Sequence, residues 1–169
     1  MKKTILLGSI IAVICILLDQ LSKGIILTYL HFEGDFIEVI PGFFKLFLQY
    51  NPYIAFSIEL PFEWQMIATG AATIIFVVMA IWSDFKKKPF YSWGIYLMIG
   101  GMIGNFIDRV FNDGKGVIDF LSFTFFGKPF ATFNIADSCL VIGVICIIVD
   151  LLFFETKREK KNIKDRIKE

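Results

Sequence analysis

Long uncharged stretches dominate the pattern of hydrophobic and polar positions along the chain. Residues 64–83 and 89–107 contain no Asp, Glu, Lys or Arg over 20 and 19 positions. Because a helix rises about 1.5 Å per residue, each stretch is close to the length that crosses about 30 Å of hydrocarbon. Two further apolar stretches, 4–23 and 133–154, carry isolated charges. The pattern predicts an all-α membrane protein with four transmembrane helices.

The composition supports this prediction. Of the 169 residues, 56% are hydrophobic, 17% are aromatic and 20% are charged, and the mean hydropathy is +0.68. These values are unusual for a soluble domain and exclude a disordered chain. The net charge of +1 offers no basic excess, so we expect no nucleic-acid partner. The length predicts one domain over residues 1–169.

The first apolar stretch could instead be a cleaved signal peptide, because Lys2 and Lys3 precede it. No small-x-small cleavage pattern follows the stretch, and Ile14 rather than a small residue precedes Cys15. We therefore expect this stretch to stay in the protein as its first helix.

Positive charges are concentrated on one side of the predicted helices. Twelve of the 17 Lys and Arg residues share this side: Lys2, Lys3, Lys86, Lys87, Lys88, Lys157, Arg158, Lys160, Lys161, Lys164, Arg166 and Lys168. The positive-inside rule places them and both termini in the cytoplasm, with segments 31–62 and 108–128 outside. The tail 155–169 is then a cytoplasmic extension of the fourth helix that can contact anionic lipid.

Both predicted outer segments contain strand-like patterns. Residues 35–60 are rich in Phe, Ile and Val and contain turn dipeptides, which predicts a small extracytoplasmic β-cradle at the membrane surface. In the second segment, Asn-Asp-Gly at 112–114 is a strong turn signal between 110–111 and 116–120. We therefore predict a hairpin there that directs Asp119 toward the helix ends.

Carboxylates are the side chains that remain for catalytic chemistry. The single histidine, His31, cannot form a metal cluster, and the three cysteines lie in apolar stretches. We therefore expect neither a metal ion nor an organic cofactor. The acids placed near the outer helix ends are Asp19, Asp108, Asp113, Asp119 and Asp137. Asp119 is the hardest of them to explain structurally, because its neighbours are apolar.

Several of these polar residues also have purely structural explanations. Asn134 could be only the N-cap of the fourth helix, and Asp137 could be favoured in its first turn by the helix dipole. Asp108 and Arg109 could form an ion pair at the membrane interface. These explanations stay open at this point.

Helix one and helix three also carry spacings that suggest close contact. Asp19 and Lys23 are four positions apart and could neutralise each other. Gly100 and Gly104, with Gly101 beside them, form a Gly-x-x-x-Gly face that favours tight helix packing. Such packing would bring acids of different helices within reach of one another.

The residues support a hypothesis in which Asp119 and Asp137 face each other across a water molecule. Two adjacent carboxylates cannot both ionise at low cost, so the pair shares a proton. The ionised member then acts as base and the protonated member as acid, as in an aspartic peptidase. The residues expected to hold the pair in position are Asn105, Asn134, Asp108 and Arg109.

A proton or ion transporter is the alternative, because acids within a membrane also line such pathways. The acids here cluster at one membrane face, and the sequence shows no inverted internal repeat. An inactive lipid-binding or assembly subunit is a third alternative, which the intact acids disfavour. The distribution of acids therefore favours a peptidase.

Four sequence blocks resemble the lipoprotein signal peptidases, or signal peptidase II. The blocks are Asp-Gln-Leu-Ser-Lys at 19–23, Gly-Gly-Met-Ile-Gly-Asn-Phe-Ile-Asp-Arg at 100–109, Gly-Val-Ile-Asp-Phe at 116–120 and Phe-Asn-Ile-Ala-Asp-Ser at 133–138. The resemblance implies that Asp119 and Asp137 are catalytic. The supporting residues that it implies are Asp19, Lys23, Asn51, Asn105, Asp108, Arg109, Asn134 and Ala136.

The same resemblance implies a substrate and a location. The substrate would be a prolipoprotein whose cysteine carries diacylglycerol, cut just before that cysteine. The enzyme would lie in the bacterial cytoplasmic membrane, in contact with its lipids and with its site at the outer face, and we expect a monomer. One block departs from the family, because Tyr53 stands where Gly is usual and adds a large ring near the presumed substrate groove.

The lack of zinc ligands in the sequence predicts that peptidase activity survives chelators. Treatment with a chelator before a cleavage assay on a lipidated precursor should leave the rate unchanged. A loss of activity that added zinc restores would contradict the carboxylate hypothesis.

Overall fold

The computed structural model describes residues 2–54 and 58–167 of the chain. This part contains four helices long and apolar enough to cross a membrane. They are α1 (Lys2–Tyr29), α2 (Phe62–Ile81), α3 (Pro89–Phe111) and the continuous helix Ile135–Lys160, of which α4 (Ile135–Val149) is the first part. The four predicted helices are therefore confirmed. Helix α1 continues past its predicted end at residue 23, because the sequence becomes apolar again after Lys23.

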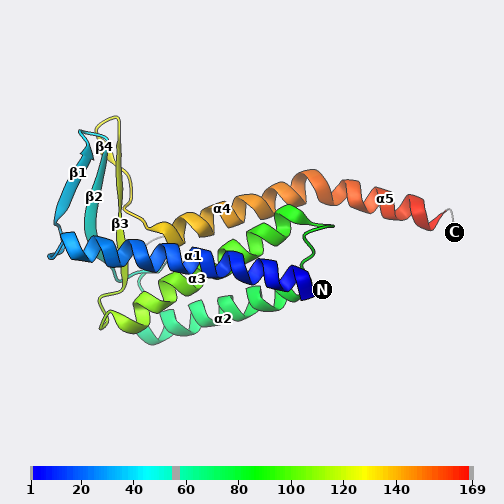
Figure 1. Cartoon of the computed structure of the whole chain (residues 1–169), viewed down its shortest axis with the longest axis horizontal. Helices are drawn as coiled ribbons and strands as arrows, with labels where there is room; N and C mark the ends of the chain where they lie inside the picture. Colours follow the sequence, from blue (N-terminus) through cyan, green and yellow to red (C-terminus); the bar gives the residue numbers. More distant parts are fainter. Residues whose placement is uncertain (1, 55–57, 168–169) are drawn as a thin grey trace.

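A helical extension follows α4 without a break. The backbone passes through a π-helical segment, η2 (Asp150–Glu155), into α5 (Thr156–Arg166). Figure 1 shows this extension projecting beyond the end of the bundle. Arg158 of α5 reaches back to form ion pairs with Asp150 and Glu155. These ion pairs fix the direction of the extension relative to α4.

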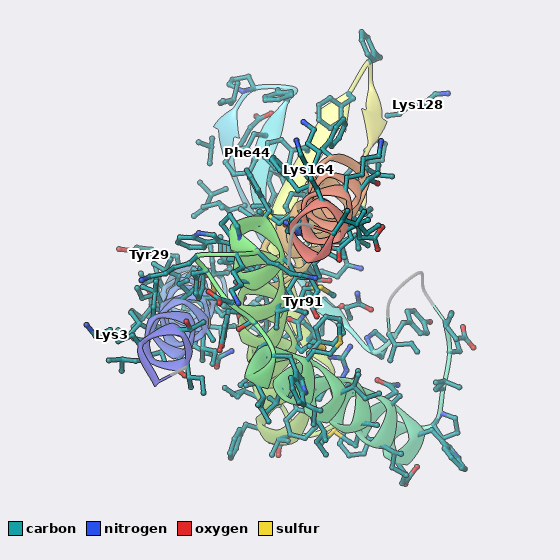
Figure 2. The ribbon with its side chains drawn as sticks, turned by 90° about the vertical axis from the view of Figure 1, so that its right-hand side faces the viewer. Lys3, Tyr29, Phe44, Tyr91, Lys128 and Lys164 are labelled. Atoms are coloured by element: carbon teal, nitrogen blue, oxygen red, sulfur yellow. The ribbon has the colours of Figure 1, made fainter. Side chains whose placement is uncertain are left out.

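Helix α3 lies in the middle of the bundle and contacts α1, α2 and α4. Figure 2 looks along the helices and shows α3 in the centre, with α1 and α2 on different sides of it. Buried apolar side chains from all four helices form one cluster around it, including Ile11, Ala80, Ile95 and Cys139. Helix α3 is therefore the helix that α1, α2 and α4 all contact.

Small residues let the neighbouring helices approach α3 closely, as the glycine spacing predicts. A Cβ atom added at Gly101 would lie 2.5 Å from the carbonyl oxygen of Ala136 in α4. One added at Gly104 would lie 2.8 Å from Oδ2 of Asp19 in α1. The acids of α1 and α4 therefore lie directly against α3.

A four-stranded antiparallel sheet lies at one end of the bundle. Its strands are β1 (Phe36–Ile40), β2 (Phe44–Asn51), β3 (Val117–Phe125) and β4 (Lys128–Pro129), in that order across the sheet. Figure 1 shows the strands running across the helix direction, at the end opposite to both termini. The strands predicted within 35–60 are confirmed, whereas the location of the sheet outside the cytoplasm stays a prediction.

The predicted hairpin around residues 112–114 is wrong. Residues 110–111 form the last turn of α3, because the helix continues through them. Positive φ angles at Asp113 (50°) and Gly114 (78°) then turn the chain from the helix into β3. Strand β3 pairs with β2, which lies far earlier in the sequence.

The pairing of β2 with β3 places the end of β2 beside the helices. Asn51 lies opposite Val117, and Gln49 lies opposite Asp119. Gly116 has a φ of 91°, and a Cβ atom there would lie 2.1 Å from the carbonyl oxygen of Asn51. Only glycine permits this approach, so Gly116 sets the position of Asn51.

Close packing at Gly101 predicts that Gly101→Ala destabilises the bundle. The added methyl group would overlap the backbone of α4, and overpacking of this kind costs roughly 1–3 kcal/mol. Gly70→Ala in α2 is the matched control, because a Cβ atom there meets nothing within 4 Å. Thermal unfolding of the purified proteins in detergent should show a lower midpoint for Gly101→Ala alone. Equal midpoints for the two variants would contradict the packing.

Candidate active site

Asp119 is directed toward the helices by the alternation of side chains along β3. Its neighbour Ile118 packs on the other face of the strand, in an apolar cluster with Leu48. Asp119 is 1% exposed. Its carboxylate accepts hydrogen bonds from Nδ2 of Asn51 at 3.0 Å and from Nδ2 of Asn134 at 2.8 Å. A buried carboxylate therefore points from the sheet toward the start of α4.

Asp137 lies in the first turn of α4, where Asn134 is the N-cap. The backbone N–H of Asp137 donates to Oδ1 of Asn134 at 2.8 Å, and the backbone N–H of Asn134 donates to Oδ2 of Asp137 at 3.3 Å. Nδ2 of Asn105 in α3 donates to the other oxygen of Asp137 at 2.7 Å. The N-cap role expected for Asn134 is confirmed, and it is only part of what this residue does.

Asn134 connects the two carboxylates. Its Nδ2 atom lies 2.8 Å from Oδ1 of Asp119 and 3.1 Å from Oδ1 of Asn105. Because Asn105 also donates to Asp137, a continuous series of hydrogen bonds runs from one acid to the other. The structure thus brings together two acids and two asparagines that are far apart in the sequence.

The pKa of Asp119 is raised to about 7, chiefly because burial disfavours its charged form and also because Asp137 lies nearby. Hydrogen bonds from Asn51 and Asn134 and the charge of Lys23 act in the opposite direction. Below about pH 7 the side chain therefore carries a proton. A carboxyl group in this state can donate a proton, and its ionised form can accept one.

A buried ammonium group lies behind the two acids. Nζ of Lys23 lies 2.7 Å from a carboxylate oxygen of Asp19 and 2.7 Å from one of Asp108, and these three side chains are at most 3% exposed. The ammonium group also donates to Oδ1 of Asn105 at 3.2 Å. The expected pairing of Asp19 with Lys23 is confirmed, and Asp108 joins it.

Each carboxylate of this cluster also holds a backbone amide. Asp19 accepts from the backbone N–H of Ala136 at 2.8 Å. Asp108 accepts from the backbone N–H of Ile118 at 3.0 Å. These two amides belong to the residues that directly precede the two candidate acids. The cluster therefore positions the backbone on both sides of the site.

The expected ion pair between Asp108 and Arg109 is wrong. Consecutive residues of a helix point in different directions, so Asp108 faces Lys23 and Arg109 does not. The guanidinium group of Arg109 donates instead to three neutral acceptors. They are the carbonyl oxygen of Tyr53 at 3.1 Å, the carbonyl oxygen of Asn105 at 3.2 Å and Oε1 of Gln65 at 3.4 Å.

Sequence reasoning missed two glutamines that belong to the site. Nε2 of Gln20 donates to Oδ1 of Asp108 at 2.9 Å and to the carbonyl oxygen of Gly104 at 3.1 Å. Gln65 accepts from Arg109. Both glutamines lie in stretches predicted to cross the membrane. An amide there needs a hydrogen-bond partner, and this requirement was the signal that could have identified them.

A pocket of about 490 Å³ shares several residues with this network. Its wall includes Arg109, Tyr53 and Gly116. The backbone N–H of Tyr53 donates to Oδ1 of Asn51, and Nδ2 of Asn51 donates to Asp119. The position that departs from the family pattern therefore lines the pocket and contacts Asn51, which is a hydrogen-bond partner of Asp119.

Comparisons with known proteins match nearly the whole chain. Residues 11–153 match the family model of signal peptidase (SPase) II. A lipoprotein signal peptidase of Staphylococcus aureus is 37% identical over 169 residues, covering 97% of this chain and 100% of the relative. One from Symbiobacterium thermophilum is 30% identical over 152 residues, covering 90% and 98%. A solved bacterial membrane enzyme has a TM-score of 0.70 and 38% identity, covering 87% of this chain and 93% of that chain.

The apolar helices and the structural match define a multi-pass membrane protein with a buried polar site at one end of its bundle. The chain belongs to the signal peptidase II family, whose members are proteases. The resemblance carried by the four sequence blocks is therefore confirmed.

The surroundings of Asp119 predict that its side chain loses a proton near pH 7. Infrared difference spectra of the wild type against Asp119→Asn should show a carboxylic acid band that disappears with a midpoint near pH 7. Asn51→Ala removes a hydrogen bond that lowers the pKa, so it should move this midpoint to higher pH. A midpoint at about 4, the ordinary value for an exposed carboxyl group, would contradict the role given to burial.

Proposed function

We propose that this protein is an endopeptidase that removes the signal peptide from prolipoproteins, cutting just before a cysteine that already carries diacylglycerol. Membership of the signal peptidase II family supports cleavage of prolipoprotein signal peptides. The observation that carries the catalytic part is the connection of buried Asp119 to half-buried Asp137 through Asn134. We assign the catalytic roles to these two acids.

The proposed chemistry is that of an aspartic peptidase with one water molecule between the acids. Asp137, in its ionised form, takes a proton from the water as the water oxygen attacks the carbonyl carbon of the scissile bond. Asp119 holds a proton below about pH 7 and donates it to the developing oxyanion. Collapse of the tetrahedral intermediate breaks the C–N bond and returns this proton to Asp119, while Asp137 passes its proton to the leaving nitrogen. Both acids are then restored.

The other site residues position the acids or face the substrate. Three asparagines hold the carboxylates by hydrogen bonds: Asn51, Asn105 and Asn134. The buried charges fix the backbone next to the acids through Asp19, Lys23, Asp108 and Ala136. Arg109 presents a cationic donor to the pocket. The mechanism uses no metal ion or organic cofactor.

The proposed orientation places the site at the outer face of the bacterial cytoplasmic membrane, with both termini in the cytoplasm. The basic segment 86–88 and the basic helix α5 lie at the end of the bundle opposite to the sheet, as the positive-inside rule requires. The sheet then forms an extracytoplasmic cradle that receives the peptide part of the substrate while the lipid part stays in the bilayer. We propose that a monomer suffices for this reaction.

Replacing either acid by its amide should abolish cleavage without unfolding the protein. Asp119→Asn and Asp137→Asn each remove one titrating group, and a loss of roughly 10³-fold or more in kcat is expected. Asp113→Asn is the matched control, because Asp113 is exposed in the turn before β3. The measurement is the gel mobility of a diacylglyceryl-modified precursor after incubation with each purified variant, with gel filtration as the test of folding.

Full cleavage by either catalytic variant would end the dyad hypothesis. A precursor that the wild-type protein leaves uncut, together with proton-driven flux in liposomes, would favour the transporter alternative.

A further inference from the structure

Helix α2 buries a glutamine in its first turn. Of the described residues of α2, Gln65 and Ala80 alone are buried. Gln65 is 6% exposed. Burying an amide is unfavourable unless hydrogen bonds satisfy it. A buried glutamine on a helix with so few buried residues therefore points to a specific task.

The amide of Gln65 connects two distant backbone positions. Its Nε2 atom donates to the carbonyl oxygen of Pro52 at 2.8 Å and to that of Leu60 at 2.8 Å. These two residues lie near the two ends of the connection between β2 and α2. One side chain thus uses both of its donor hydrogens to hold both ends of the connection.

Arg109 adds a third point of attachment. Its guanidinium group donates to the carbonyl oxygen of Tyr53 at 3.1 Å and to Oε1 of Gln65 at 3.4 Å. We refer to the carbonyl groups of Pro52, Tyr53 and Leu60 as the anchored carbonyls. All three residues line the pocket of about 490 Å³, as do Gln65 and Arg109 themselves.

The network ends one residue away from Asn51, a hydrogen-bond partner of Asp119. Asn51 directly precedes Pro52 and donates to Asp119 at 3.0 Å. Asn51 is also held independently, by pairing with β3 and by its close approach to Gly116. Loss of the Gln65 amide would therefore release the pocket wall while Asn51 keeps its place at the acid.

We propose that Gln65 is a positioning residue for substrate binding, whose two amide hydrogens hold the anchored carbonyls in the pocket wall beside the acids. The inference rests on the proposed function and identifies a part of the site that receives the substrate. Gln65 acts through the backbone of the β2–α2 connection, and its described contacts include neither acid. Its removal weakens substrate binding and leaves the chemical step intact.

Two substitutions distinguish the role of the donor hydrogens of Gln65 from the role of its acceptor oxygen. Gln65→Met keeps the length of the side chain and removes both functions. Gln65→Glu keeps an acceptor for Arg109 and, when ionised, lacks the hydrogens that the carbonyls of Pro52 and Leu60 accept. Thr73→Val is the matched control on the same helix, because the Thr73 hydroxyl donates within α2 to the carbonyl oxygen of Thr69.

Steady-state cleavage of a diacylglyceryl-modified precursor gives the main result. Gln65→Met and Gln65→Glu should each raise KM about tenfold and change kcat by less than about threefold, because they remove binding that persists unchanged into the transition state. Thr73→Val should match the wild type in both constants. A wild-type KM for Gln65→Glu, or a fall in kcat at unchanged KM, would overturn the proposal.

Hydrogen exchange of the backbone amides of Tyr53 and Ile54 supplies a readout that needs no turnover. These amides should exchange faster in both Gln65 variants and at the wild-type rate in Thr73→Val. Unchanged exchange in both Gln65 variants would overturn the anchoring, even if one of them were too unstable for kinetics. Failure of the wild-type protein to cut any lipidated precursor would overturn the proposed function instead, and the exchange rates would still decide whether Gln65 holds the anchored carbonyls.

Discussion

The site depends on one buried ammonium group, that of Lys23, shared by Asp19 and Asp108. Buried charges stabilise one another only while every partner is present, and removing one partner of a buried pair costs roughly 3–5 kcal/mol. Asp19 holds the backbone amide of Ala136, and Asp108 holds that of Ile118. The same positive charge thereby sets the start of α4 and the start of β3. Each candidate acid follows one residue later in its element.

The bundle can bury these charges because its helices come close together. Gly104 leaves room for the carboxylate of Asp19, and Gly101 lets the backbone of α4 rest on α3. At this separation the carboxylates of the site find donors on the next helix and need not face lipid. Helix α2 takes little part in this packing. Its contribution at the site end is the single amide of Gln65, which serves the pocket instead of the acids.

The helices and the convergence of the acids could be predicted from the sequence, because both depend on residue type and spacing. The length of an apolar run identifies a spanning helix, and carboxylates remained once imidazole and thiolate chemistry was set aside. The predicted hairpin failed because residues 110–111 fit the last turn of a helix as well as a strand. The pairing of Asp108 with Arg109 failed because adjacent residues diverge on a helix. Gln20 and Gln65 were missed because a neutral amide does not interrupt an apolar run, and most of its partners lie far along the chain.

Strand β3 has a different partner on each face. Ile118 packs into the apolar cluster under the sheet, while Asp119 contacts Asn134 at the start of α4. The sheet cannot dock on the bundle without delivering Asp119, and Asp119 cannot reach its partners before docking. A chain with its helices formed and its strands unpaired would hold Asp137 without Asp119. The proposed pair of acids is therefore complete only in a chain whose sheet is docked on the bundle.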